Sequence, residues 1–180
     1  SLDLRLTPNQ DVLICNISNK HKNEIELELK DIGYENLDNI NEIQRHALAC
    51  PALPLCGLAM TEAERILPDI LERVDNLLKS LNIEKTILFR ITGCPNGCSR
   101  PYMAELALVG SGLNKYQLWL GGSKNLQRLA KPYLQRMPLE DMEITLTPLL
   151  LEWSKYCLDL DFGDFVDKND DSFILELLNN

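Results

Sequence analysis

The stretches Cys50-Pro51-Ala52-Leu53-Pro54-Leu55-Cys56 and Cys94-Pro95-Asn96-Gly97-Cys98 contain four of the six cysteines in this chain of 180 residues. Five residues separate the cysteines of the first loop, and three separate those of the second. The 37 residues between the loops (57–93) predict a helix followed by a strand. Because a packed helix–strand unit can return the second loop to the first, we expect the four thiolates to converge. Four thiolates around one point suit zinc or an iron–sulfur cluster.

The spacing of these cysteines favours an iron–sulfur cluster over zinc. Cysteine pairs in structural zinc sites are usually separated by two to four residues, often as a repeated knuckle. Here the two pairs differ, and the gap of five residues is wide for a zinc turn. Each loop has a proline directly after its first cysteine, and backbone N–H groups in such loops can point at sulfur and tune the potential of a cluster. Zinc, disulfides and unrelated thiols remain alternatives.

The residues around both loops resemble those of a known family, the assimilatory sulfite reductase haemoproteins. The segment ALACPALPLCGLAMTEAER (47–65) is similar to the first cluster loop of that family, and TGCPNGCSRP (92–101) is similar to the second. The resemblance extends to RLTPNQ (5–10) near the start and to FGDF (162–165) near the end, so it covers nearly the whole chain. It implies a mixed α/β fold in which helices cover a sheet, as in the C-terminal domain of the sirohaem and iron–sulfur reductases.

The resemblance also implies two cofactors, a [4Fe-4S] cluster and sirohaem. By this likeness Cys50, Cys56, Cys94 and Cys98 ligate the cluster. Cys98, the last of the four, corresponds to the thiolate shared with the sirohaem iron, and it is the residue nearest to catalysis. A shared thiolate couples the two cofactors electronically and shortens electron transfer to one ligand. Sulfite is then expected to bind the open face of the haem iron, opposite Cys98.

Five polar residues are expected to contact the cofactors: Arg5, Asn9, Gln10, Arg45 and Asn96. The first three lie in the segment that the family places beside sirohaem, where they could meet the carboxylates of the macrocycle. Arg45 precedes the first cysteine loop, and a guanidinium pairs bidentately with carboxylates. Asn96 lies within the second loop. Apart from the resemblance, the segment 5–10 predicts only a turn with polar surface residues.

Sulfite, rather than nitrite, is favoured by the apolar Pro-Ala-Leu-Pro interior of the first loop, since related nitrite reductases usually have a more polar loop. Pro51 is similar to the ferredoxin-dependent type, so ferredoxin is the expected electron donor. The Arg and Lys residues that bind the anion in this family belong to an N-terminal half that is absent here, and we expect that half as a partner. A sirohaem nitrite reductase, a non-catalytic iron–sulfur electron-transfer module and a zinc-stabilised domain are the rival interpretations.

The composition agrees with a reductase part and excludes some other classes. Hydrophobic residues make up 45% and charged residues 25%, as in ordinary globular proteins. The net charge of −9 disfavours nucleic-acid binding, which normally needs a basic patch. There is no apolar run long enough for a membrane helix and no signal peptide, and Ser1 is not expected to be a native start. Six clustered cysteines suggest reduced thiols in the cytoplasm, or in the plastid stroma of a plant or alga.

Residue patterns predict two parts, with 1–45 belonging to a domain shared with the absent half and 46–180 forming the cofactor domain. Thr61 and Glu64 predict a capping box at the start of a helix that ends near residue 82. Cys15, in an apolar run, is expected to be a core residue, and Cys157 is expected to be a core or surface thiol. The predicted strands are 11–17, 86–91, 104–109 and 116–120, and the other predicted helices are 20–32, 124–135 and 139–157. The tail, 158–180, is expected to dock loosely.

Overall fold

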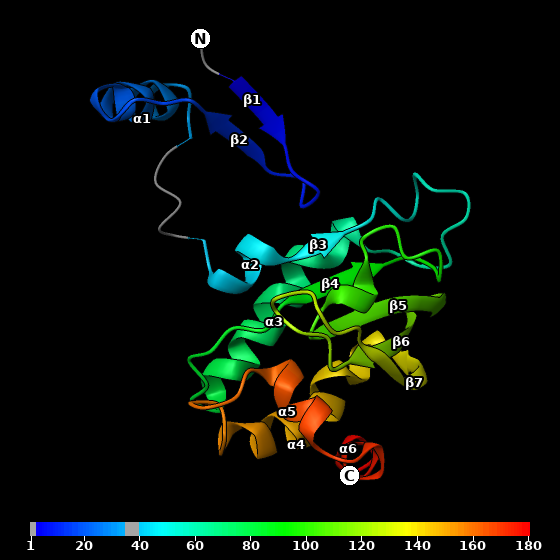
Figure 1. Cartoon of the computed structure of the whole chain (residues 1–180). Coiled ribbons are helices and arrows are strands. Elements are labelled where there is room, and N and C mark those ends of the chain that lie inside the picture. The colour runs from blue at the N-terminus through cyan, green and yellow to red at the C-terminus, as the bar shows by residue number, and fades with distance from the viewer. Residues whose placement is uncertain (1–2, 35–39) are drawn as a thin grey trace. The chain divides into compact units, whose positions relative to one another are not determined.

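A computed structural model of the chain describes residues 3–34 and 40–180, so residues 1–2 and 35–39 of the predicted first domain lie outside the description. The chain divides into two compact units, Ser1–Asn41 and Glu42–Asn180 (Figure 1). Among the described residues, no helix is both long and apolar enough to pass through a lipid bilayer.

The first unit consists of a two-stranded ribbon and a helix. Strands β1 (Asp3–Leu6) and β2 (Val12–Cys15) pair antiparallel, and α1 (Lys22–Asp31) follows a short 3₁₀ turn. The predicted strand and helix of this region are confirmed, and Gly33 after the helix has a left-handed φ of 92°. None of the described residues of this unit is buried. A two-stranded ribbon is marginally stable by itself, and the domain shared with another part of the protein stays a prediction.

The second unit is built on a five-stranded sheet in the order β3-β4-β5-β6-β7 (Figure 1). Its strands are β3 (Leu48–Ala49), β4 (Phe89–Thr92), β5 (Leu106–Gly112), β6 (Lys115–Leu120) and β7 (Lys131–Pro138). Strands β3, β4 and β5 run parallel, whereas β5, β6 and β7 are antiparallel neighbours. The parallel part matters for function, because parallel strands bring the loops that follow them to one edge of the sheet.

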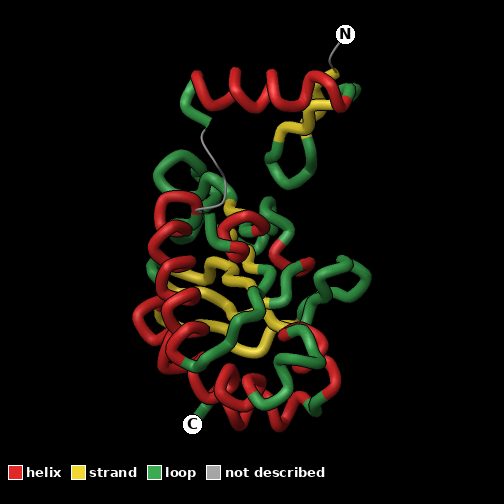
Figure 2. Tube along the Cα trace, turned by 90° about the vertical axis from the view of Figure 1, so that its left-hand side faces the viewer, coloured by secondary structure: helices red, strands yellow, loops and turns green. Residues whose placement is uncertain are grey.

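Helices cover this sheet and form the core with it (Figure 2). The helices are α2 (Glu42–His46), α3 (Leu67–Ser80), α4 (Met142–Ser154), α5 (Phe162–Lys168) and α6 (Asp171–Leu178). Alternate residues of β4, Phe89 and Ile91, join the main hydrophobic cluster, as do Leu106 and Leu108 of β5. This alternation is the period of two expected for a strand with one face in the core. The predicted mixed α/β fold, a sheet covered by helices, is therefore confirmed.

Two local predictions about helices are wrong. The Thr61 hydroxyl does not cap a helix: it lies within hydrogen-bonding distance of the Tyr116 hydroxyl and accepts a bond from the Asn114 N–H, and α3 begins only at Leu67. No helix spans 124–135, because the second half of that segment forms β7, which pairs with β6. Leu126 instead has a left-handed φ of 61°. The leucine spacing resembled a helix, but strand pairing at the sheet edge decided the structure.

The C-terminal tail is packed and does not dock loosely. Helices α5 and α6 bury Phe162, Phe165 and Ile174 in the main hydrophobic cluster. The Tyr133 hydroxyl of β7 donates a hydrogen bond of 2.8 Å to Asp171 at the start of α6. The tail therefore belongs to the core of the second unit. The prediction of loose docking was wrong because the apolar residues of the tail occur in short groups between acidic residues, a pattern that resembles an exposed segment.

Glu105 is a buried carboxylate that joins α5 to the parallel strands. Its side chain accepts hydrogen bonds from the N–H groups of Leu88 at 2.8 Å and Gly163 at 3.0 Å, and the residue is 0% exposed. Burial raises the pKa of this carboxyl above its ordinary value of 4.5, although the two N–H groups and the charge of Lys124 oppose the shift. Compared with the unfolded chain, the fold therefore shifts this carboxyl toward its protonated form.

Glu105→Gln is expected to change how stability depends on pH. Because the pKa of Glu105 is raised in the folded state, the carboxyl contributes stability that is fully present below its unfolded-state pKa. That contribution is lost as the pH rises through the folded-state pKa. The glutamine cannot ionise, so the free energy of unfolding of the wild type minus that of the variant should fall as the pH is raised from 4.5. Urea denaturation at several pH values measures this difference. Glu84→Gln, at an exposed position, is the control, and a flat difference for Glu105→Gln would contradict the prediction.

Candidate cofactor site at the ends of two parallel strands

The two cysteine loops begin at the same edge of the sheet. Cys50 directly follows β3, and Gly93 and Cys94 directly follow β4. These strands are parallel neighbours, with Ala49 beside Ile91, and the Cys50 N–H donates to the Ile91 carbonyl at 3.3 Å. The expected return of the second loop to the first is therefore present in the structure.

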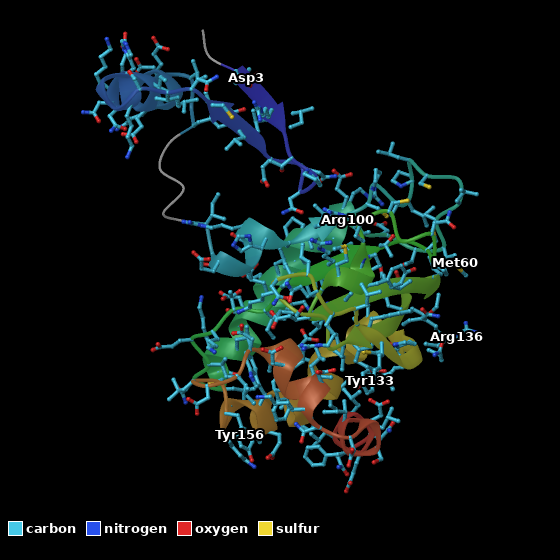
Figure 3. All side chains as sticks on the ribbon, in the orientation of Figure 1. Asp3, Met60, Arg100, Tyr133, Arg136 and Tyr156 are labelled. Atoms are coloured by element: carbon cyan, nitrogen blue, oxygen red, sulfur yellow. The ribbon has the colours of Figure 1, made fainter. Side chains whose placement is uncertain are left out.

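Gly93 holds the first loop against the second. Its carbonyl accepts hydrogen bonds from the N–H groups of Met60 at 2.8 Å and Thr61 at 3.3 Å. A Cβ at Gly93 would lie 2.6 Å from the Ala52 Cβ and 2.8 Å from the Thr61 carbonyl oxygen. No larger residue fits there, so the loops can approach this closely only because position 93 is glycine. Met60 itself is 44% exposed and lies on the outer side of the first loop (Figure 3).

The second loop is a tight turn supported by Tyr102. Gly97 has a left-handed φ of 69°, and a Cβ there would lie 2.7 Å from the Tyr102 ring. The Tyr102 hydroxyl donates to the Pro95 carbonyl at 2.7 Å, and the Arg100 N–H donates to the Gly97 carbonyl at 2.8 Å. The Ser99 hydroxyl bonds back to the β4 backbone at 2.7 Å. These contacts fix the backbone around Cys94 and Cys98.

Arg90 lies beneath the second loop and is 1% exposed. One of its guanidinium nitrogens donates to the Arg100 carbonyl at 3.1 Å, whereas its buried Nε atom has no partner among the described residues. Burial, and then the charge of Arg100, lowers the pKa of the Arg90 guanidinium. Arg90 therefore supports the loop through a backbone carbonyl. Arg100, labelled in Figure 3, has a left-handed φ of 53° and follows the last cysteine by two residues.

The four cysteines of the loops differ in their surroundings. Cys50 and Cys94 are both 7% exposed, Cys56 is half-buried, and Cys98 is exposed. The Cys50 sulfur accepts hydrogen bonds from the Gly93 N–H at 3.2 Å and the Thr92 hydroxyl at 3.3 Å. Donors directed at a buried sulfur stabilise the thiolate, which is the form that binds metals. The exposed position of Cys98 leaves its sulfur accessible to a second group.

The chemistry of this site fits an iron–sulfur cluster. All six cysteines are free thiols. Within residues 3–34 and 40–180, no group of three or more His, Cys, Asp or Glu side chains is placed to hold one metal ion. A [4Fe-4S] cluster binds each cysteine through a different iron atom, and the convergence of all four thiolates stays a prediction. Two cysteine loops at one sheet edge, with donors directed at sulfur, therefore fit a cluster.

The other predicted contact residues lie in three places. Arg45 is near the end of α2, where its guanidinium lies 3.7 Å from the Glu42 carboxylate, and Asn96 is exposed in the second loop. Arg5 is in β1 and bonds to Asp3 at 2.9 Å, while Asn9 and Gln10 lie in the turn before β2. These last three belong to the first unit, so their approach to the cofactor site stays a prediction.

Sequence reasoning missed several residues that shape the site. Thr92 and Gly93 lie between the two loops, and Gly110 of β5 packs on the Gly93 carbonyl, where a Cβ would lie 2.3 Å from the oxygen. The only sequence feature that pointed to these residues was the glycine at position 93, directly before the second cysteine motif. Gly122 packs on Ala104, whose carbonyl oxygen would lie 2.2 Å from an added Cβ.

Comparisons with known proteins show where this arrangement belongs. A mixed α/β unit with two cysteine loops at one sheet edge fits the class of α/β proteins that bind an iron–sulfur cluster. The chain is 48% identical over 170 residues to the "Sulfite reductase [ferredoxin]" of Synechococcus elongatus. It is 42% identical over 166 residues to the "Sulfite reductase [NADPH] hemoprotein beta-component" of Staphylococcus saprophyticus. These matches cover 93% and 91% of the chain but 27% and 29% of the relatives. By sequence, the chain is similar to the sulfite reductase haemoproteins and spans less than a third of their length.

The fold has a counterpart among solved structures. The structure of the NirA protein of Mycobacterium tuberculosis matches with a TM-score of 0.71 and 19% identity, over 96% of this chain and 33% of that one. At this identity the likeness concerns the fold alone. No family model matches the chain.

Proposed function

We propose that this chain is the cofactor-binding part of a sulfite reductase, in which a [4Fe-4S] cluster and sirohaem share one thiolate. The observation that carries the proposal is the pair of cysteine loops on neighbouring parallel strands, in a chain 48% identical to a sulfite reductase. Disulfides do not account for these thiols, which are all free. The cofactors would supply one-electron transfers, which together accomplish the six-electron reduction of sulfite to sulfide.

In this proposal Cys50, Cys56, Cys94 and Cys98 hold the cluster, and Cys98 is shared with the sirohaem iron. The exposure of Cys98 supports this role, since a bridging sulfur must be reached by both cofactors. Buried Cys50 and Cys94 would hold the cluster away from water, and the hydrogen bonds to the Cys50 sulfur would tune its potential.

Arg45, Asn96, Arg5, Asn9 and Gln10 are proposed to contact the sirohaem periphery. Arg45 would supply a guanidinium for a carboxylate of the macrocycle. The three residues of the first unit would act once that unit is packed in the complete protein, as the absence of buried residues in it suggests. Sulfite is the proposed substrate, and the remaining part of the reductase is the proposed source of the anion-binding cations.

The electron donor is proposed to be ferredoxin, on the likeness of Pro51 in the first loop and on the relative from Synechococcus elongatus. The NADPH-linked type is the alternative, because relatives with that name match nearly as well. Reduction by ferredoxin, or by a flavoprotein partner with NADPH, would distinguish the two in an assay of sulfide formation. The cytoplasm, or a plastid stroma, remains the expected compartment.

Cofactor analysis of the complete reductase that contains this chain, produced together with sirohaem synthesis, tests the proposal. We expect a haem-type absorption band, acid-labile sulfide, and about four cluster irons plus one haem iron per site. A cluster without haem would favour an electron-transfer module. Zinc with no visible absorption would contradict the proposal. Kinetics with sulfite and nitrite would separate the two reductase types.

A further inference from the structure

The Cys50 sulfur accepts two hydrogen bonds from consecutive residues at the end of β4. The Gly93 N–H donates at 3.2 Å and the Thr92 hydroxyl at 3.3 Å. All of these groups are enclosed: Thr92 is 0% exposed and Cys50 is 7% exposed. Low local dielectric strengthens such bonds, and a thiolate acceptor makes them charge-assisted.

The Thr92 hydroxyl has a choice of acceptor. Besides the Cys50 sulfur, the Cys94 carbonyl oxygen lies within 3.4 Å of it, and a hydroxyl has one hydrogen to donate. When the sulfur carries charge, it is the stronger acceptor, so the hydrogen is directed to Cys50. Thr92 then connects a ligand of the first loop to the strand that carries the second. The Gly93 N–H is a backbone donor that every residue type except proline would supply, so Thr92 is the side chain on which the number of bonds to this sulfur depends.

We propose that Thr92 is a positioning residue that sets the reduction potential of the cluster through its hydrogen bond to the Cys50 thiolate. The inference rests on the proposed function. A cluster gains one negative charge when it accepts an electron, and part of that charge resides on its thiolate ligands. A donor at the sulfur stabilises the reduced form more than the oxidised form. Thr92 therefore raises the potential, which favours acceptance of electrons from the donor.

Substitutions at Thr92 test this in the complete, cofactor-loaded reductase. Thr92→Val keeps the shape of the side chain and removes the hydroxyl, whereas Thr92→Ser keeps the hydroxyl. Thr86→Val is the matched control, because the buried Thr86 hydroxyl has no hydrogen-bond partner among the described residues. The readout is a redox titration of the cluster followed by electron paramagnetic resonance, with iron and sulfide content measured on each sample.

We expect Thr92→Val to shift the one-electron reduction equilibrium about tenfold toward the oxidised form, which lowers the potential by about 59 mV. Thr92→Ser and Thr86→Val should keep the wild-type potential. The loss of potential should occur with unchanged iron and sulfide content. Rescue by serine separates the effect of the hydroxyl from that of side-chain packing.

The outcomes distinguish this inference from the function on which it rests. A wild-type protein without a cluster would overturn the proposed function. A wild-type cluster whose potential is the same in Thr92→Val would overturn the inference alone. Thr92→Ala provides a second variant if the valine variant does not fold. If both variants lose the cluster while serine retains it, Thr92 has a structural role and the proposed tuning is wrong.

Discussion

Cys98→Ser is expected to abolish the coupling between haem and cluster and to reduce sulfite reduction by more than about 100-fold, beyond the loss typical of changing a residue that supports a ligand. A serine hydroxyl is far less acidic than a thiol, and oxygen is a harder ligand than sulfur, so it is a poor bridge between two irons. Cys98 is exposed, so the substitution should leave the core intact. Electron paramagnetic resonance of the oxidised reductase and a sulfide assay measure the two effects.

Cys157→Ser is the matched control for this prediction. Cys157 is a free thiol of the same unit, 8% exposed, and it donates a hydrogen bond to the Ser154 carbonyl at 3.3 Å, which a serine hydroxyl can replace. The control should keep the coupled signal and the activity. Retention of the coupled signal in Cys98→Ser would show that another residue forms the bridge.

Gly110→Ala is expected to destabilise the second unit by about 1–3 kcal/mol, the usual cost of overpacking, and to lower cofactor content. An added Cβ would lie 2.3 Å from the Gly93 carbonyl oxygen and 2.5 Å from its carbon, so backbone must move. The Gly93 carbonyl accepts the Met60 and Thr61 N–H groups, and the displacement would reach both cysteine loops. Urea denaturation of the chain and iron analysis of the complete reductase measure the two effects.

Gly112→Ala, two residues further along β5, is the control for Gly110→Ala. The nearest atoms to a Cβ at Gly112 are the Arg136 guanidinium at 3.5 Å and the Lys115 Cβ at 4.0 Å, which are ordinary contacts. This variant should keep the wild-type denaturation midpoint and iron content. Equal effects of the two substitutions would mean that general strand propensity, rather than contact with Gly93, limits the site.

The cysteine loops could be found from sequence because their ligands lie in two short segments with internal spacing. The residues that hold those loops together could not. The Thr92 hydroxyl contacts the Cys50 sulfur although the two residues are 42 positions apart in the sequence. Gly110 of β5 packs on the carbonyl of Gly93, which follows the neighbouring strand β4. Such contacts depend on strand order and register, which no local pattern records. The roles of Arg5, Asn9 and Gln10 also depend on how the first unit packs in the complete protein.

The sequence by itself determined the first helix and the strands near 104–109 and 116–120, because periodicity and turn residues are local properties. The resemblance of the residues around the cysteine loops implied the mixed α/β fold. Only the tertiary structure decided that residues 131–138 form an edge strand instead of a helix, and that α5 and α6 enter the core. It also decided that Thr61 bonds across the fold to Tyr116 instead of capping a helix. In each case contacts between distant segments outweighed local preference, because burial and strand pairing contribute more free energy than intrinsic propensity does.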